Sequence, residues 1–389
     1  MIEIVKQPGE YCFVGNPVLF RLKSDSQDPV EIEIAYQTNK VALKGYPYKT
    51  EEGYLIDIDI SDVLKSFFDN GLAMYGETIG IAEYPEFIRE CTVTIDAKVY
   101  IIKAIDGGVS NDNLTELLGF GDDMFSYRLK NPERSLLFTT RTNSPNIALR
   151  ESELFPFVFL HPGKPITFVS SNDNTITESS LPEGTPCLMD LAYIRRLFLD
   201  LYDELPAFIT VQVDGADSSY ITITRSQWSE NMCWLVFKNS LGGYECMEIT
   251  GKGYYVPALS EENSYQQYTD QGTFSLRRER VEVQNVISIH AGFKNQQELN
   301  FLMDLIATNR CYLIYPDKRV MECIPSAENP KYAMRITEPT SLELKLKNVN
   351  SSRYHSPRID MARPGAWIWD GIWDDYGRWF DNKQINDNK

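Results

Sequence analysis

The sequence predicts a mainly β protein, in which tandem antiparallel β-sandwich modules precede a small α+β module with one clear helix. Apolar and polar residues alternate with a period of two, as in Val30–Ile34 and Leu342–Leu346, which is typical of strands with one buried and one wet face. Gly, Pro, Asn and Asp separate these short runs. The chain also has 22 Tyr and 19 Phe, residue types that suit a pleated surface.

The alternating runs divide the chain of 389 residues into modules. Turn-forming residues at Asp106–Gly108 end the first run of strands, and a polar stretch low in aliphatic residues follows the second. The expected order is a β-sandwich at 1–105, a connecting segment at 106–133, a second β-sandwich at 134–257, a linker or loop at 258–273, an α+β module at 274–350, and a Trp-rich C-terminal segment at 351–389.

Three segments have the apolar spacing of a helix. The first, 61–68, begins with Ser61, which we expect to cap it. The second covers 188–203, where apolar residues recur every three to four positions. The third, 296–308, is the clearest, because Asn295 followed by Glu298 resembles a capping box. Its predicted apolar face comprises Leu299, Leu302, Met303 and Ile306.

The charge and the cysteines restrict the class of protein. The chain has 38 Lys and Arg against 55 Asp and Glu, a net charge of −17. Such a surface repels phosphate, so we expect no specific nucleic-acid binding and no association with an anionic membrane. Seven cysteines without a C-x-x-C pair predict free, buried, reduced thiols. No signal-like or membrane-spanning apolar run is present, which predicts synthesis in the cytoplasm.

The sequence carries no recognisable catalytic or metal-binding motif. Its three histidines, at 161, 290 and 355, are far apart, and no zinc, phosphate-binding or nucleophile-elbow spacing occurs. We therefore predict no enzymatic activity, no cofactor and no metal. A glycoside hydrolase built on Asp or Glu pairs stays open as an alternative. For Asp57 and Asp59, we expect a solvated strand face, because Ile56, Ile58 and Ile60 should face the core.

The C-terminal segment is the most unusual, since four of the six tryptophans fall between 367 and 379. Each can bury on the order of 150–250 Å², so the segment should dock on its own domain, on another subunit, or on a sugar. The irregular spacing predicts an irregular segment shaped by a partner. The candidate interface residues are Trp367, Trp369, Asp370, Trp373, Asp374, Asp375, Tyr376, Trp379 and Phe380.

Three parts of the chain resemble one group of proteins. The opening has Gln7-Pro8, then Phe13, Asn16-Pro17 and Phe20, in a QP…F-x-x-NP-x-x-F arrangement. Trp234–Glu245 is similar to the pattern W-x-x-F-x-N-x-x-G-x-x-E and predicts a hairpin whose two glycines take positive φ. The layout of a third part is similar as well: Ile289–Phe293, the helix at 296–308, and strands at Cys311–Tyr315 and Leu342–Leu346. The group is that of tail-associated structural proteins, distal-tail or baseplate-like, from phages and prophages of Bacteroidota gut bacteria.

The resemblance implies a virion protein of the phage tail or baseplate. Such a protein assembles as a symmetric homo-oligomer, a ring or hub with three- or six-fold symmetry, and contacts neighbouring tail proteins. The resemblance carries over no active site. A carbohydrate- or host-receptor-binding module on the same β scaffold, with a host surface glycan as ligand, remains the alternative function.

Deleting 356–389 is expected to leave a folded, soluble protein that no longer assembles. Aromatic anchors carry much of the energy of an interface, and truncating one at a hot spot costs upwards of about 2 kcal/mol. Circular dichroism and size-exclusion chromatography of the truncated chain measure both effects. A truncated chain that unfolds or precipitates, while tryptophan point variants keep the oligomer, would show that the segment belongs to its own core.

Overall fold

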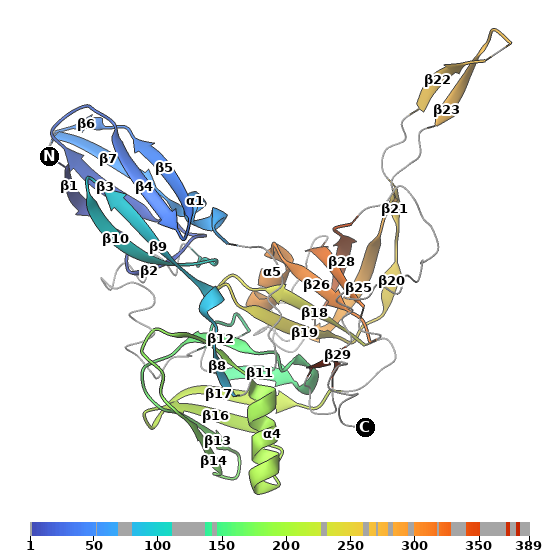
Figure 1. The fold of residues 1–389 in the computed structure, drawn as a ribbon. Helices are drawn as coiled ribbons and strands as arrows, with labels where there is room; N and C mark the ends of the chain where they lie inside the picture. The colour runs from blue at the N-terminus through green and yellow to red at the C-terminus, as the bar shows by residue number, and fades with distance from the viewer. Residues whose placement is uncertain are drawn as a thin grey trace. The chain divides into compact units, whose positions relative to one another are not determined.

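The computed structural model has a mainly β fold with several antiparallel sheets and few helices (Figure 1), which confirms the predicted fold class. The described residues are 2–51, 53–68, 80–110, 137–141, 146–226, 232–259, 264–269, 271–278, 283–294, 299–316, 319–327, 340–350, 371–373 and 379–381. The chain divides into two compact units. Unit 1 comprises Met1–Leu149, Phe155–Thr224 and Asn239–Glu245, and unit 2 comprises Arg150–Leu154, Arg225–Lys238 and Cys246–Lys389.

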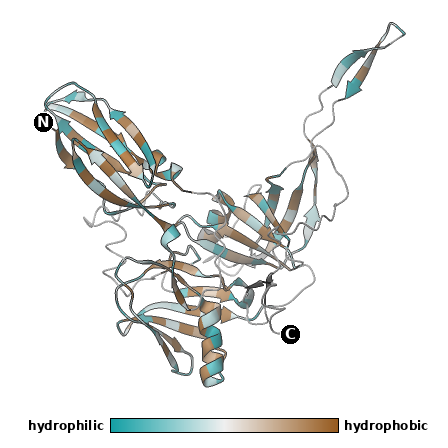
Figure 2. Ribbon diagram, viewed as in Figure 1, coloured by the Kyte–Doolittle hydropathy of each residue, from teal (hydrophilic) through white to brown (hydrophobic). Residues whose placement is uncertain are grey.

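Unit 1 begins with a β-sandwich. One sheet has the order β1-β3-β7-β6, with β1 at Ile2–Lys6, β3 at Leu19–Ser24, β7 at Gly53–Asp59 and β6 at Tyr48–Thr50. The other has the order β2-β10-β9-β4-β5, with β2 at Tyr11–Phe13, β10 at Lys98–Ile105, β9 at Ile88–Ile95, β4 at Val30–Tyr36 and β5 at Asn39–Gly45. Alternating residues of both sheets, including Phe20, Ile32, Ile56 and Val93, share one buried core, and Figure 2 shows this alternation along the strands.

A short helix, α1 (Ser61–Ser66), follows β7. The predicted Ser61 cap is wrong. The N-cap position is Ile60, whose side chain accepts no hydrogen bond. Instead, Asp59 Oδ1 accepts a hydrogen bond from the backbone N–H of Ser61 at 3.0 Å. The acidic residue at the end of β7 therefore satisfies the first helical N–H, which an N-cap side chain would otherwise do.

The rest of unit 1 combines two sheets and one helix. A five-stranded sheet has the order β11-β17-β16-β13-β14, with β11 at Asn146–Arg150, β17 at Ala216–Thr224, β16 at Phe208–Val213, β13 at Ile166–Ser170 and β14 at Thr175–Glu178. A three-stranded sheet has the order β12-β15-β8, with β12 at Phe157–Leu160, β15 at Pro186–Met189 and β8 at Ile81–Glu83. A 3-10 helix of unit 1 is η1 (Pro85–Phe87), and another, η2 (Glu151–Glu153), belongs to unit 2. Because β8 pairs with β15, the expected boundary at residue 105 does not separate the sheets.

Helix α4 (Leu191–Tyr202) begins later than predicted, because residues 186–189 form strand β15. Asp190 caps it: its side chain accepts a bond from the backbone N–H of Tyr193 at 3.0 Å. Ile194 and Phe198, one turn apart, are fully buried. The helix therefore contributes an apolar stripe to the core of unit 1.

Most of unit 2 is a seven-stranded sheet with α5 (Leu299–Ala307). The order is β19-β18-β26-β27-β28-β25-β20, with β19 at Tyr244–Ile249, β18 at Cys233–Lys238, β26 at Cys311–Ile314, β27 at Val320–Ser326, β28 at Thr340–Asn348, β25 at Val286–Lys294 and β20 at Gly253–Tyr255. Strands β18 to β20, which the sequence assigned to the second sandwich, thus share a sheet with the expected α+β module. The expected boundary at residue 257 therefore falls between two strands of the same sheet, β20 and β25.

The buried face of helix α5 matches the predicted one in part, since Leu302 is buried and Ile306 is partly buried against the core. Phe301, Leu302 and Leu305 are buried, and the Phe301 ring lies 5.1 Å from that of Phe237. Met303 is 43% exposed, so its assignment to the apolar face is wrong. The pairs 301–305 and 302–306 define the stripe, since residues four apart share a helix face. The predicted capping box at Asn295 and Glu298 lies outside the described residues.

Three two-stranded ribbons complete the description. They are β21 (Ala258–Leu259) with β24 (Val283–Gln284), β22 (Ser264–Tyr268) with β23 (Phe274–Arg278), and β29 (Gly371–Trp373) with β30 (Trp379–Asp381). The segment expected to be a linker at 258–273 therefore contains strands. No helix among the described residues is long and apolar enough to cross a membrane. All seven cysteines are free and six are buried, which confirms the prediction of free thiols.

A buried histidine links β12 to the loop before β15. His161 is fully buried, and its Nδ1 and Nε2 lie 3.2 Å and 3.5 Å from the backbone N–H groups of Gly163 and Leu181. Protonation would place an N–H on both ring nitrogens, opposite these backbone donors. Burial lowers the pKa of His161 from its ordinary value of 6.5.

We expect acid to destabilise unit 1 through His161. Because its pKa is lower in the folded state, the unfolded chain binds this proton first, so stability is lost as pH falls from 6.5 through the folded pKa. The urea midpoint should fall between pH 7.5 and pH 5.5, and less so in His161→Gln. A His290→Gln control should keep the wild-type dependence. Equal dependence in wild type and His161→Gln would contradict the prediction.

Candidate functional site

The predicted C-terminal site is only partly described. Trp373, Trp379 and Phe380 lie on β29 and β30, where Trp373 pairs with Trp379 and Ile372 with Phe380. The other candidates lie outside the described residues: Trp367, Trp369, Asp370, Asp374, Asp375 and Tyr376. The expectation of an irregular segment is wrong for the two short strands. A periodicity within one run could not reveal this pairing, because it joins two separate runs.

The acidic pair on β7 is part of the sandwich surface. Asp57 accepts hydrogen bonds from Arg21 Nε at 2.6 Å and Tyr48 Oη at 2.9 Å, and the Arg21 guanidinium lowers the pKa of Asp57. Asp59 Oδ1 accepts bonds from the backbone N–H groups of Val18 and Ser61. Both carboxylates lie on the exposed strand face opposite the buried isoleucines, as predicted. They tie β7 to its neighbours.

The opening motif also makes structural contacts. Asn16 Nδ2 donates to the backbone carbonyl of Val109 at 2.9 Å, and its Oδ1 accepts from the Val109 N–H at 2.8 Å. The N–H of Gly15 donates to the Gly107 carbonyl at 2.7 Å. A Cβ on Gly15 would lie 2.7 Å from that oxygen, so only glycine allows this approach. The motif therefore joins the chain after β2 to the chain after β10.

The second motif forms the turn between β18 and β19. The Asn239 N–H donates to the Gly243 carbonyl at 2.7 Å, and the Gly242 N–H donates back to the Asn239 carbonyl at 3.0 Å. Gly242 has φ +89°, but Gly243 does not adopt a left-handed conformation. The expectation that both glycines take positive φ is therefore wrong. Gly243 instead packs closely, since a Cβ there would lie 3.2 Å from the Phe138 carbonyl oxygen.

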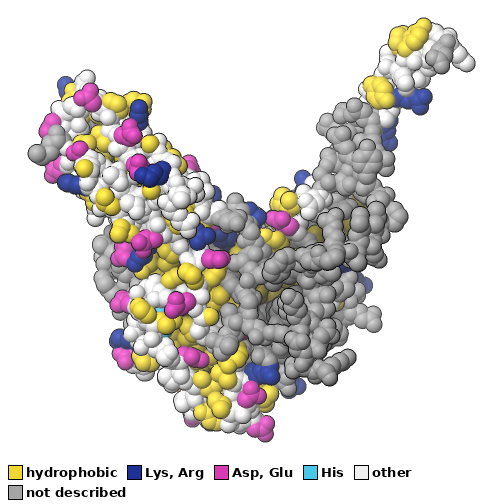
Figure 3. All heavy atoms as spheres, viewed as in Figure 1, with side chains coloured by type: hydrophobic (Ala, Val, Ile, Leu, Met, Phe, Trp, Pro, Cys, Tyr) yellow, Lys and Arg dark blue, Asp and Glu magenta, His cyan; other side chains and the backbone are white. Residues whose placement is uncertain are grey.

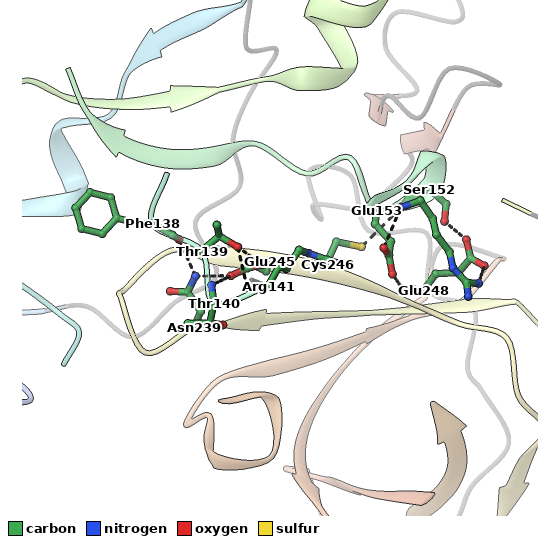
Figure 4. A network of polar contacts seen from close by, with 11 residues as sticks. Phe138, Thr139, Thr140, Arg141, Ser152, Glu153, Asn239, Glu245, Cys246 and Glu248 are labelled. Carbon is green, nitrogen blue, oxygen red and sulfur yellow. Dashed lines mark hydrogen bonds and ion pairs between the residues drawn. The ribbon is translucent and has the colours of Figure 1, made fainter. Parts of the chain in front are cut away.

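The same motif ends at Glu245, whose carboxylate is the centre of a buried polar network (Figure 4). Asn239 Nδ2 donates to Glu245 Oε1 at 2.6 Å, and the Thr140 N–H donates to the same oxygen at 3.0 Å. Thr139 Oγ1 donates to Oε2 at 3.0 Å. Arg141 Nε lies 3.2 Å from Oε2, with both side chains nearly inaccessible. Every oxygen of this buried carboxylate thus has partners from the protein.

Burial raises the pKa of Glu245, while Arg141 and the surrounding donors act in the opposite direction. The cation matters most for stability, because an unpaired carboxylate in such a site would be costly. The network joins residues 138–141 to the β18–β19 turn, about a hundred residues later in the chain.

A second buried glutamate, Glu248, lies on the same strand within unit 2. Arg150 Nη1 donates to Glu248 Oε1 at 2.7 Å, and Ser152 Oγ donates to Oε2 (Figure 4). Nearby, Glu153 Oε1 accepts from the Glu248 N–H at 2.8 Å, and its Oε2 accepts from the Arg150 N–H at 3.1 Å. Sequence reasoning missed these buried charges, because the alternation around β19 reads as an ordinary strand.

These glutamates do not have the arrangement of a glycosidase pair. Glu245 and Glu248 are 1% and 0% exposed, so no polysaccharide can reach them. They also lie on opposite faces of β19, because strand side chains alternate. Among the described residues, no group of three or more His, Cys, Asp or Glu could hold a metal ion. The buried carboxylates therefore stabilise the fold through their hydrogen bonds and ion pairs.

The ribbon β22–β23, which we call the hairpin arm (Ser264–Arg278), is the most exposed aromatic element described. Every residue of its two strands is exposed except one, which is half-buried. Tyr268 pairs with Phe274 in the register, and their rings lie 5.4 Å apart. The Thr269 N–H donates to the Thr273 carbonyl at 2.8 Å and closes the turn. The arm is therefore a well-formed hairpin with aromatic side chains in solvent.

Comparisons with known proteins give little guidance. No known family model matches the sequence, and no curated protein matches it significantly. Among solved structures, the I9–I11 tandem of titin is similar with 11% identity and a TM-score of 0.15, covering 73% of this chain and 94% of that one. The full extracellular region of plexin A4 is similar with 10% identity and a TM-score of 0.16, covering 90% of this chain and 39% of that one. Such low scores carry no argument about this chain.

We expect the Arg141–Glu245 pair to be essential to unit 1. Arg141→Met should lower the free energy of unfolding by about 3–5 kcal/mol, because it leaves a buried carboxylate without its cation. The double variant Arg141→Met/Glu245→Gln should recover at least half, since the amide oxygen still accepts from Asn239. Urea unfolding followed by tryptophan fluorescence measures both.

The exposed pair Arg21–Asp57 provides a control for this measurement. Arg21 is 47% exposed at its side chain, so Arg21→Met should cost clearly less than Arg141→Met. Equal losses at the two sites, or no recovery in the double variant, would show that the buried pair has no special role.

Proposed function

We propose that the protein is a non-enzymatic structural component of a phage tail or baseplate, which assembles as a symmetric oligomer and contacts neighbouring tail proteins. The observation that carries this proposal is the hairpin arm. A two-stranded hairpin alone is marginally stable in water, and this one exposes Tyr268, Phe274 and Leu276 to solvent. Such a surface gains stability when a protein partner covers it.

The resemblance to tail-associated proteins supports the same function. Asn16, Asn239 and Glu245, the polar residues of its motifs, all make structural hydrogen bonds. Motif residues that make structural hydrogen bonds are consistent with a structural protein. On this proposal the protein resides in the virion tail after synthesis in the host cytoplasm, and the three- or six-fold symmetry is that of the tail.

The overall charge supports a role beside DNA without specific binding to it. A net charge of −17 repels the phosphate backbone, which suits a component of a tail through which DNA passes. The alternative, a receptor-binding module for a host glycan, requires exposed aromatic platforms. It depends mainly on the C-terminal tryptophans, and a glycan array comparing wild type with Trp373→Ala separates it from the structural role.

The purified full chain should form one discrete closed oligomer. We expect size-exclusion chromatography with light scattering to give a mass of three or six subunits, independent of dilution over a tenfold range, and negative-stain images to show rings or hubs. Protein that stays monomeric up to about 100 μM, well above the dissociation constants of stable complexes, would refute the proposed function.

A further inference from the structure

One face of the hairpin arm has more large apolar side chains than the other. Residues that pair across an antiparallel ribbon share a face. The pairs Tyr268–Phe274 and Gln266–Leu276 therefore place three large apolar side chains together, whereas the pairs Gln267–Ser275 and Tyr265–Arg277 lie on the other face. Tyr268, Phe274 and Leu276 are 65%, 68% and 71% exposed. The apolar face is thus continuous and open to a partner.

The arm also differs in charge from the rest of the chain. Between Ser264 and Arg278 the arm has two arginines, Arg277 and Arg278, and one acidic residue, Asp270, a net charge of +1, whereas the whole chain carries −17. Figure 3 shows dark blue basic side chains next to yellow apolar ones on this ribbon. Two arms of like net charge repel each other. The rest of another copy, here called the body, is acidic overall and attracts an arm. Charge therefore favours a contact between the arm and the body over a contact between two arms.

The body has an unpaired strand edge with exposed apolar side chains. Strand β10 pairs with β9 along its whole length, but with β2 only over Lys103–Ile105. Within the described residues, no strand pairs with the other edge of β10 over Lys98–Ile102. Val99 and Ile101 on this stretch are 61% and 57% exposed. The edge is therefore both apolar and unpaired.

The register shows which backbone groups face this edge. Asp96 and Ala97 form a two-residue turn with positive φ, so the flanking pair Ile95–Lys98 is hydrogen-bonded. Bonded pairs alternate along an antiparallel ladder, so Val99 and Ile101 point their N–H and C=O groups away from β9. The Lys103 N–H, in the same phase, donates to the Glu10 carbonyl on that side at 2.7 Å. The free stretch can accept an added strand in the same way.

Two other edge strands expose less apolar surface. Edge strand β5 carries two exposed lysines, Lys40 and Lys44, against one, Lys98, on the open stretch of β10, and lysines on an edge strand discourage pairing. Edge strand β14 exposes Thr175 and Thr177 and no large apolar side chain. A flat apolar edge such as that of β10 invites association unless a specific partner occupies it.

We propose that the hairpin arm of one copy docks on the open edge of β10 in the next copy, as an added strand whose apolar face covers Val99 and Ile101. This inference rests on the proposed function, since it names the interface through which the oligomer forms. The contact is heterologous: each copy gives one arm and receives one, so repetition closes a ring when the rotation allows it. One arm buries a modest area, and closure of the ring supplies the remaining stability.

Two variants test the two sides of this contact. Leu276→Asp on the arm and Ile101→Asp on the edge should each raise the subunit dissociation constant at least about tenfold, as hot-spot residues do. Matched controls are Leu201→Asp on α4 and Val5→Asp on β1, whose side chains are 62% and 54% exposed. The controls should assemble as the wild type does. Far-UV circular dichroism and melting curves confirm that each variant is folded.

Mixing the two defective variants gives the sharper test. A dimer of Leu276→Asp with Ile101→Asp has one intact contact, made by the arm of the second and the edge of the first. The mixture should therefore form a heterodimer that neither variant forms alone, and it should not grow further. Native mass spectrometry distinguishes the two subunits by mass. An interface between two arms gives a different result, because Ile101→Asp keeps an intact arm and would then assemble without Leu276→Asp.

The charge component has its own measurement. Arg277→Glu/Arg278→Glu should weaken assembly, and the wild-type contact should weaken as salt rises from 50 to 500 mM. If the wild type is monomeric, the proposed function fails. If the wild type assembles but either aspartate variant assembles equally well, only this inference fails. Loss of binding to duplex DNA in the arginine variant, with assembly unchanged, would reassign the arm to nucleic acid and also overturn it.

Discussion

The buried carboxylate of Glu245 holds together segments of unit 1 that are far apart in the sequence. It accepts bonds from Asn239 in the preceding turn and from residues 139–141, which lie about a hundred positions earlier. Such a group requires all of its partners, because a buried charge that loses its cation is costly. The β18–β19 turn also lies against the chain after β10, where the Gly108 N–H donates to the Ser240 carbonyl at 2.6 Å. One polar centre therefore fixes the turn and the path of the segments around it.

Local pattern predicted the strands better than it predicted their partners. The alternation around Phe20, Ile32 and Ile56 predicts the first sandwich, since one face of each strand must be buried. The pairing of β8 with β15, and of β18 with β26, could not be predicted. Each joins residues about eighty to a hundred positions apart, and nothing in either strand's own sequence specifies its neighbour. Module boundaries drawn from composition failed for the same reason.

The candidate sites could be predicted only in part. The pattern ending at Glu245 was found as a motif, but its buried ion pair depends on Arg141, which lies in a stretch without a strand pattern. The predicted linker at 258–273 contains the first strand of the hairpin arm, because Ser, Gln, Thr and Gly are frequent in residues 260–272. An exposed hairpin has a similar composition, with polar residues on both faces and a few aromatic residues among them. The C-terminal tryptophans were recognised by composition, which says nothing of their positions.

Charge and exposed apolar surface have opposite effects on association between copies of this chain. A net charge of −17 keeps free copies apart through mutual repulsion, while Phe274 and Leu276 favour association. In the proposed contact, Arg277 and Arg278 would give the attraction a direction, because the arm has a net charge of +1 and the whole chain −17. An unspecific apolar patch would join any two surfaces. The proposed contact would instead restrict association to one register, since hydrogen bonds, apolar cover and charge must all match at once.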